Sequence, residues 1–167
     1  GVIKKNELLK LNKSLKTLRK NFINGKFKLT DKYEDCHSAI EFYLINELGD
    51  LGKKVHTGRS RNDQVMVAMR LFAKKNLIEF KTKNKLIAET FLNLAKKHKD
   101  LPMPGYTHLQ RAMPSSWGLW FSSYAESFID NGDLINNTID WIDSNPLGSA
   151  AGYGVAIPLN RDLVTKE

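Results

Sequence analysis

The chain has little cysteine: Cys36 is the only one among 167 residues. An intrachain disulfide is therefore impossible, and the reducing cytoplasm is the compartment we expect. No apolar run approaches the roughly 18 residues of a membrane-spanning helix, and no signal segment opens the chain, so we expect no membrane partner. The first residue is glycine rather than methionine, and we expect the chain to be a piece of something longer.

Patterns for nucleotide and metal binding are also absent from the sequence. The glycines near the end of the chain form neither G-x-x-x-x-G-K-[ST] nor a strand-to-helix GxGxxG. The four histidines show no metal-like spacing with one another or with carboxylates. We expect neither a metal ion nor an organic cofactor.

The formal net charge of +8 is unevenly distributed. Residues 1–28 hold nine Lys or Arg and one acid, Glu7, whereas the rest of the chain holds 17 of each sign. We interpret this basic segment as a solvated helix face, with an anionic partner surface as the alternative. The segment has no aromatic interleaving and no recognition motif, so we expect no nucleic-acid partner.

Apolar residues recur at helical spacing in four segments, which predicts an all-α fold. Thr30-Asp31 offers a cap for the second segment, and Asn160 offers one for a further helix near the end of the chain. The tail from Ser144 is otherwise predicted to be loop, and no β pattern is visible. The four segments cover residues 8–22, 31–48, about 63–98 and about 114–143.

Two of these helices, with about 30 residues or more each, have apolar stripes that the rest of the chain is too short to cover. Exposed stripes predict self-association, so we expect an oligomeric bundle of long helices. We divide the chain into an N-terminal helical region, residues 1–57, and the first part of a central bundle domain, residues 58–167.

A polar motif precedes the longest helix, and its letters are HTGRSRNDQ over residues 56–64. Two guanidinium groups and several short hydrogen-bonding side chains lie next to unsatisfied helix N–H groups, which together favour an anion. Arginine presents a planar fork that matches a carboxylate. Ser60 followed by Asp63 also resembles a capping box, and a capped helix with exposed arginines is the alternative interpretation.

A second polar motif, PGYTHLQ over residues 104–110, also precedes a long helix. His108 has an imidazole that can move protons near neutral pH, and Thr107 and Gln110 could fix its orientation. A histidine beside a glycine turn is more often structural, and that alternative stays open at this point.

The two motifs resemble the argininosuccinate lyase family of the fumarase/aspartase superfamily. The segments EDCHS at 34–38, PGYTHLQRAMP at 104–114 and NPLGS at 145–149 are also similar to that family. The resemblance implies a long-helix bundle and reversible β-elimination of argininosuccinate to arginine and fumarate, without a cofactor, in arginine biosynthesis or urea-cycle chemistry. It also implies a homotetramer whose active sites combine residues from three subunits.

The resemblance assigns roles to five residues of this sequence. Asn62 and Thr107 would hydrogen-bond the substrate, Ser60 and Arg61 would shape the anion pocket, and His108 would be the acid/base residue. A carbanion-like charge next to a carboxylate needs preorganised donors, which these side chains could supply.

The sequence also departs from the family. It lacks the loop G-S-S-x-M-P-Q-K-x-N-P, whose serine is the family's proposed partner base, and it lacks the family's N-terminal region. We therefore expect a fragment that is inactive alone. The alternatives are a non-catalytic, crystallin-like helical assembly and another superfamily lyase such as adenylosuccinate lyase.

Overall fold

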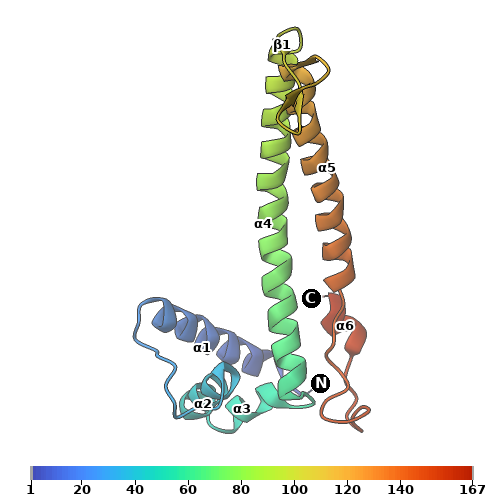
Figure 1. The fold of residues 1–167 in the computed structure, drawn as a ribbon. Coiled ribbons are helices and arrows are strands. Elements are labelled where there is room, and N and C mark those ends of the chain that lie inside the picture. The colour runs from blue at the N-terminus through green and yellow to red at the C-terminus, as the bar shows by residue number, and fades with distance from the viewer. Residues whose placement is uncertain (1, 167) are drawn as a thin grey trace. The chain divides into compact units, whose positions relative to one another are not determined.

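A computed structural model describes residues 2–166 of the chain, and helices dominate it (Figure 1). The prediction of a helical fold is confirmed. The helical elements are α1 (Lys5–Ile23), α2 (Cys36–Leu48), α3 (Asp50–Lys53), the 3-10 turn η1 (Lys54–His56), α4 (Arg61–Lys97), α5 (Trp117–Ile142) and α6 (Arg161–Lys166).

The chain forms two compact units. The first contains the residues up to Met69 together with the tail from Asn145, and the second runs from Arg70 to Ser144. Helix α4 begins in the first unit and continues into the second. The predicted division at residues 57 and 58 concerns the domains of a longer protein and stays a prediction.

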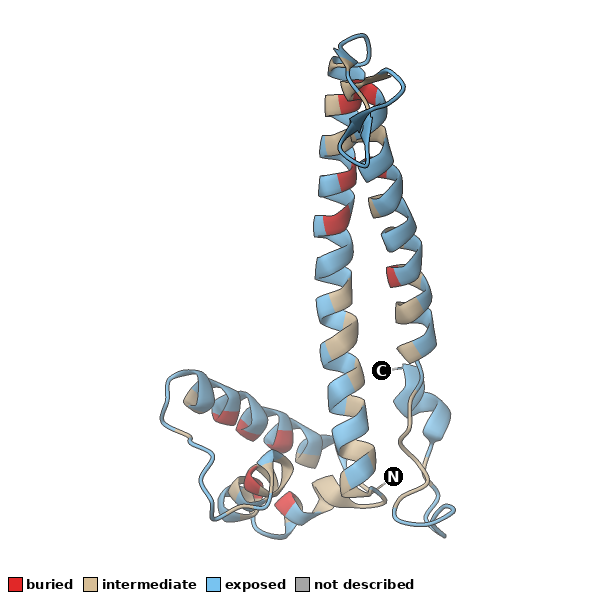
Figure 2. Ribbon diagram, in the orientation of Figure 1, coloured by how far each residue is buried: buried red, intermediate tan, exposed pale blue. Residues whose placement is uncertain are grey.

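The core of the first unit lies between α1 and α2. Leu11 and Leu18 of α1 are buried, as the apolar rhythm of that segment predicts, and Ala39 and Leu44 of α2 are fully buried (Figure 2). Gly52 of α3 approaches α2 so closely that a Cβ at this position would lie 2.4 Å from the backbone of Leu44. The short helix α3 is therefore packed directly onto α2.

Helix α2 begins later than the sequence predicted. Its N-cap is Asp35, whose carboxylate accepts a hydrogen bond of 2.6 Å from the backbone N–H of Ser38. The predicted cap at Thr30-Asp31 lies in the preceding connection, where residues 24–35 form no helix. Both sites offer a side-chain acceptor, and Asp35 has the extended backbone and the bonded N–H of a cap.

In the second unit, α4 and α5 form an antiparallel helical hairpin (Figure 1). Phe91 of α4 stacks on Tyr124 and Phe128 of α5, with ring centroids 5.2 and 5.8 Å apart. The buried side chain of Asn84 donates a 2.7 Å hydrogen bond to the carbonyl oxygen of Phe128. These contacts fix the register of the two helices, because a buried amide without its acceptor would cost free energy.

Four strands of two residues each connect α4 to α5. β1 (Pro102–Met103) pairs with β4 (Ser115–Ser116), and β2 (Tyr106–Thr107) pairs with β3 (Gln110–Arg111), both antiparallel. No β pattern is visible in the sequence here, because two residues cannot show the alternation that marks a strand. Helix α5 begins directly after β4, where Ser116 caps it by accepting a 3.1 Å hydrogen bond from Leu119.

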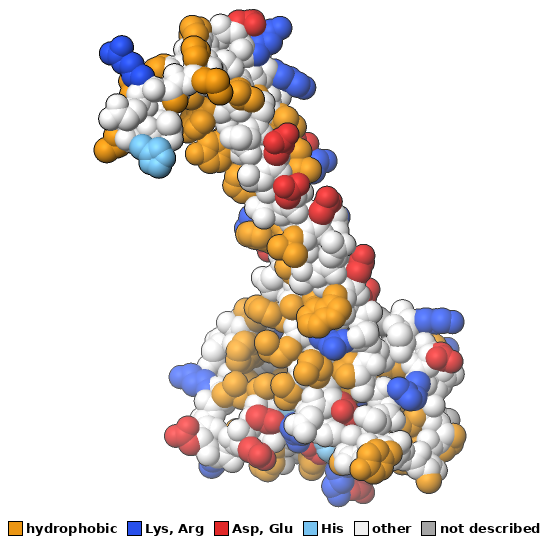
Figure 3. All heavy atoms as spheres, turned by 45° about the vertical axis from the view of Figure 1, so that its right-hand side comes forward, with side chains coloured by type: hydrophobic (Ala, Val, Ile, Leu, Met, Phe, Trp, Pro, Cys, Tyr) orange, Lys and Arg blue, Asp and Glu red, His pale blue; other side chains and the backbone are white. Residues whose placement is uncertain are grey.

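Many large apolar side chains of the second unit remain exposed, and several are visible on the face in Figure 3. Leu86 of α4, and Leu119 and Leu134 of α5, are each 64% exposed, and Trp141 is 82% exposed. The stripes that the sequence predicted are therefore only partly covered within one copy of the unit. None of the helices described between residues 2 and 166 is long and apolar enough to cross a membrane.

Candidate functional site

The motif of residues 56–64 runs from the end of η1 into the first turn of α4. The hydroxyl of Ser60 accepts a 3.2 Å hydrogen bond from the backbone N–H of Asn62, and Asp63 accepts one of 3.3 Å from the N–H of Ser60. These two hydrogen bonds cap the helix much as the sequence predicted. The one difference is that the Ser60 hydroxyl accepts from the N–H of Asn62 and not from that of Asp63. The start of α4 is thereby fixed.

The N-terminus of α4 offers donors to an anion. The first-turn N–H groups of a helix have no intrahelical acceptor, and the helix dipole adds partial positive charge. Asn62 lies in this turn with an exposed side chain. An incoming carboxylate could therefore meet an amide side chain beside backbone donors.

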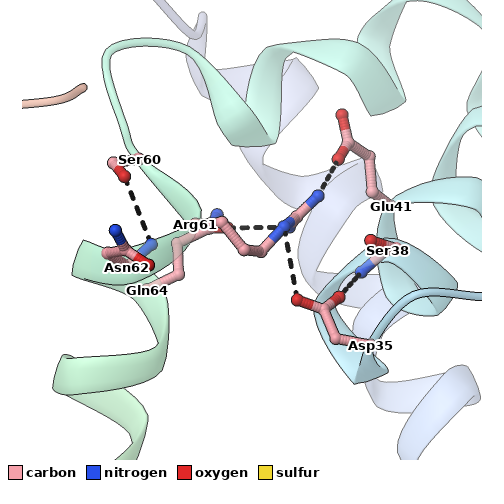
Figure 4. A network of polar contacts seen from close by, with 7 residues as sticks. All are labelled: Asp35, Ser38, Glu41, Ser60, Arg61, Asn62 and Gln64. Carbon is pink, nitrogen blue, oxygen red and sulfur yellow. Dashed lines mark hydrogen bonds and ion pairs between the residues drawn. The ribbon is translucent and has the colours of Figure 1, made fainter.

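The guanidinium of Arg61 points toward α2 and makes three contacts there and on its own helix (Figure 4). One terminal nitrogen donates to Glu41 Oε2 at 2.9 Å, and the other donates to Gln64 Oε1 at 2.8 Å. Its Nε lies 3.6 Å from Asp35 Oδ2. The hydrogen bond from the Ser38 amide lowers the pKa of Asp35 below its usual value, and the charge of Arg61 adds to this effect.

A cavity of about 300 Å³ lies beside the first motif within the first unit. Thr57, Gly58 and Arg59 line it from the motif, and Leu159 and Arg161 line it from the tail. Gly58 has a φ of +68°, and a Cβ there would lie 2.7 Å from the side chain of Leu159. The glycine of the motif is therefore favoured by its left-handed backbone conformation, and a larger residue would also displace the side chain of Leu159.

The second motif forms a two-residue β-hairpin. Thr107 pairs with Gln110, and the turn between them consists of His108 and Leu109. Their φ angles are +49° and +62°, the left-handed conformation that two-residue hairpins use and that normally favours Gly, Asn or Asp. Leu109 is 97% exposed, and His108 is also exposed. The imidazole is therefore accessible to a substrate from outside the hairpin.

The structure brings the predicted site residues together in two groups. Ser60, Arg61 and Asn62 are consecutive at the start of α4 in the first unit, and Thr107 and His108 share the hairpin of the second unit. Along the chain, the two groups flank opposite ends of α4.

The acidic partners of Arg61, Glu41 and Asp35, could not be predicted from the sequence. Glu41 lies 20 residues away on another helix, and only the packing of α2 beside the start of α4 reveals the contact. Gln64 was within reach of prediction, because residues three apart on a helix are neighbours. Within residues 2–166, no group of three or more His, Cys, Asp or Glu could hold a metal ion.

Comparisons with known proteins agree on one family. A family model described as Lyase matches residues 1–167. Argininosuccinate lyase of Xanthomonas oryzae pv. oryzae (strain PXO99A) is 50% identical over 167 residues, which are 100% of this chain and 39% of that protein. Argininosuccinate lyase of Xylella fastidiosa (strain Temecula1 / ATCC 700964) is 51% identical over 165 residues, or 99% of this chain and 37% of that protein.

A solved structure of EDDS lyase in complex with formate is similar in fold, with a TM-score of 0.73 and 31% identity over 76% of this chain and 26% of that chain. The chain thus spans well under half the length of the relatives it matches. Its helical fold agrees with the fumarase/aspartase resemblance. By its full-length match to the family model, the chain belongs to the lyase family.

Proposed function

We propose that this chain is part of an argininosuccinate lyase that reversibly converts argininosuccinate to arginine and fumarate in arginine biosynthesis. The observation that carries the proposal is the 50% identity to such a lyase over the whole chain, which includes both polar motifs. The accessible His108 and the donor-rich start of α4 supply the kinds of groups that β-elimination requires.

The reaction needs three events. A base takes a proton from the carbon next to a carboxylate, the electron pair forms the carbon–carbon double bond, and the carbon–nitrogen bond breaks as the leaving nitrogen gains a proton. Asn62 and Thr107 would hydrogen-bond the substrate, and Ser60 would help to shape the pocket that stabilises the negative charge developing on its carboxylate. His108 would transfer one of the two protons.

The family resemblance supports a site assembled from several copies of the chain. Ser60, Arg61 and Asn62 of one copy would meet Thr107 and His108 of another in a cytoplasmic homotetramer. The exposed apolar side chains of α4 and α5 would provide the contact surface. The serine loop of the family is absent from these 167 residues, so the isolated chain would be inactive.

A chimera tests the proposed activity. Residues 1–167 replace the matching segment of the Xanthomonas oryzae enzyme, which then supplies the serine loop, and fumarate formation is followed by ultraviolet absorbance. We expect fumarate from the chimera and none from the isolated chain. A chimera that is folded and assembled like its parent, yet produces no fumarate, would refute the proposed activity.

A further inference from the structure

Both terminal nitrogens of the Arg61 guanidinium have acceptors within the first unit, Glu41 at 2.9 Å and Gln64 at 2.8 Å (Figure 4). The third nitrogen, Nε, forms an ion pair with Asp35 at 3.6 Å. The side chain of Arg61 is only 31% exposed, and its two acidic partners are 25% and 28% exposed. The fork of Arg61 is thus directed at α2 and at its own helix.

The charges around Arg61 also oppose a role as the ligand of a substrate anion. Two carboxylates, those of Glu41 and Asp35, face one guanidinium, so the cluster has a net negative charge. A substrate carboxylate entering it would be repelled by groups of like charge. The exposed side chain of Asn62, on the other hand, has no hydrogen bond among the described contacts. Its backbone N–H donates to Ser60 Oγ, and the one acid of this turn, Asp63, is bonded to the N–H of Ser60.

Arg61 is also the first residue of α4 and directly precedes Asn62. Its bond to Glu41 ties the start of α4 to the middle of α2, and its contact with Asp35 ties the same point to the N-cap of α2. Partly buried, charge-assisted bonds of this kind are stronger than ordinary surface ion pairs. They restrict where the Asn62 side chain and the first-turn amides can lie.

We propose that Glu41 and Arg61 are a positioning pair, which holds the Asn62 turn in place for the reaction and does not itself bind the substrate. This inference rests on the proposed lyase function. It adds Glu41 to the residues that support the site, and it assigns Arg61 an indirect role.

A double-mutant cycle in the chimera tests the pair. Glu41→Leu and Arg61→Met each remove one partner, and we expect each to lower kcat about tenfold while KM changes less than about twofold. The double variant should be no slower than the slower single variant, because both changes break the same link. Glu41→Gln keeps an acceptor for Arg61 and should recover most of the lost kcat.

Glu47→Leu is the matched control, because Glu47 is an exposed acid on the same helix with no hydrogen bond or ion pair among the described contacts. It should leave kcat and KM unchanged. A large rise in KM for Arg61→Met with kcat retained would instead make Arg61 a substrate ligand. The proposal would also be overturned if the losses of kcat of the two single variants multiplied in the double variant. The same holds if Glu41→Leu and Glu47→Leu had the same kcat.

A readout without activity separates this proposal from the lyase assignment. The backbone N–H of Gln64 donates to Ser60 O at 3.2 Å, and its hydrogen exchange reports the order of the first turn of α4. In the chain itself, Glu41→Leu should accelerate this exchange about tenfold, and Glu47→Leu should not. An inactive wild-type chimera with this pattern would refute the lyase function alone, whereas unchanged exchange would refute the positioning pair.

Discussion

Gly118 of α5 lies against the backbone of Lys99, and a Cβ on Gly118 would be 2.6 Å from Lys99 Cα and 3.1 Å from Ala95 O. The two long helices of the second unit approach each other at this point without room for a methyl group. Lys99 and Gly118 lie at the two ends of the connection that carries the His108 turn, and their contact closes the helix pair there.

We expect Gly118→Ala to lower the free energy of unfolding by about 1–3 kcal/mol, because the backbone of Lys99 must move to admit the added carbon. Gly132→Ala on the same helix is the control. Its Cβ would lie 3.5 Å from the Asn84 side chain, an ordinary contact, so the higher helix propensity of alanine should stabilise the unit by up to about 1 kcal/mol. Urea denaturation measures the free energy of unfolding of both variants. Equal changes in Gly118→Ala and Gly132→Ala would contradict the close approach of Gly118 to Lys99.

The left-handed turn of the hairpin predicts a stabilising substitution. Leu109 has a φ of +62°, a conformation that costs a residue with a Cβ about 1–2 kcal/mol, and its side chain is 97% exposed. Leu109→Gly should therefore raise the free energy of unfolding by about 1 kcal/mol. Met113→Gly, at an exposed position without a positive φ, should not be stabilising. A loss of stability in Leu109→Gly would mean that the turn adopts another conformation.

The carboxylate of Asp35 predicts a pH dependence. The Ser38 amide and Arg61 lower its pKa in the folded chain. The charged carboxylate therefore stabilises the fold at pH values above the usual pKa of an aspartate. This stabilisation is lost as the pH falls through the lowered pKa. Asp35→Asn keeps a capping oxygen but removes the charge.

At pH 7 we expect Asp35→Asn to cost about 0.5–1 kcal/mol, and we expect the difference from the wild type to shrink as the pH falls below about 4. Thermal unfolding across this pH range measures the difference. Asp31→Asn, in the same connection but without a side-chain hydrogen bond among the described contacts, should show no such dependence. A constant cost of Asp35→Asn at every pH would show that the charge plays no part.

His108→Asn tests the acid/base residue. In the chimera, we expect it to lower kcat by about 10²–10⁴-fold, because asparagine tolerates the left-handed turn but cannot transfer a proton near neutral pH. The far-ultraviolet circular dichroism should be unchanged. The matched control is Leu109→Asn, which changes the same turn and leaves the imidazole of His108 in place. Full activity in His108→Asn would exclude a role in proton transfer.

Self-association is the expected behaviour of the isolated chain. Analytical ultracentrifugation at micromolar concentration should show an oligomer, because Leu86, Leu119, Leu134 and Trp141 expose apolar surface that one copy does not cover. Polar replacement of Leu86 and Leu134 should shift the chain toward the monomer without unfolding it. A wild-type monomer at these concentrations would contradict the proposed assembly.

The sequence by itself determined the helices and the two motifs, because both are local properties. Apolar spacing predicted α1, α4 and α5, and the capping residues Ser60 and Asn160 mark the starts of α4 and α6 as expected. The residues of 56–64 and 104–110 are sufficient to indicate the family, and the full-length match confirms it.

Only the tertiary structure decided the partners of those residues. The start of α2 depends on which of two acceptors, Thr30-Asp31 or Asp35, receives the hydrogen bond of a first-turn N–H, and the partner of Arg61 depends on how α2 packs beside α4. The left-handed turn at His108 and Leu109 contains no glycine, so the sequence gives no sign of its conformation. Such features follow from contacts between segments far apart in the sequence, where neither periodicity nor local propensity carries information.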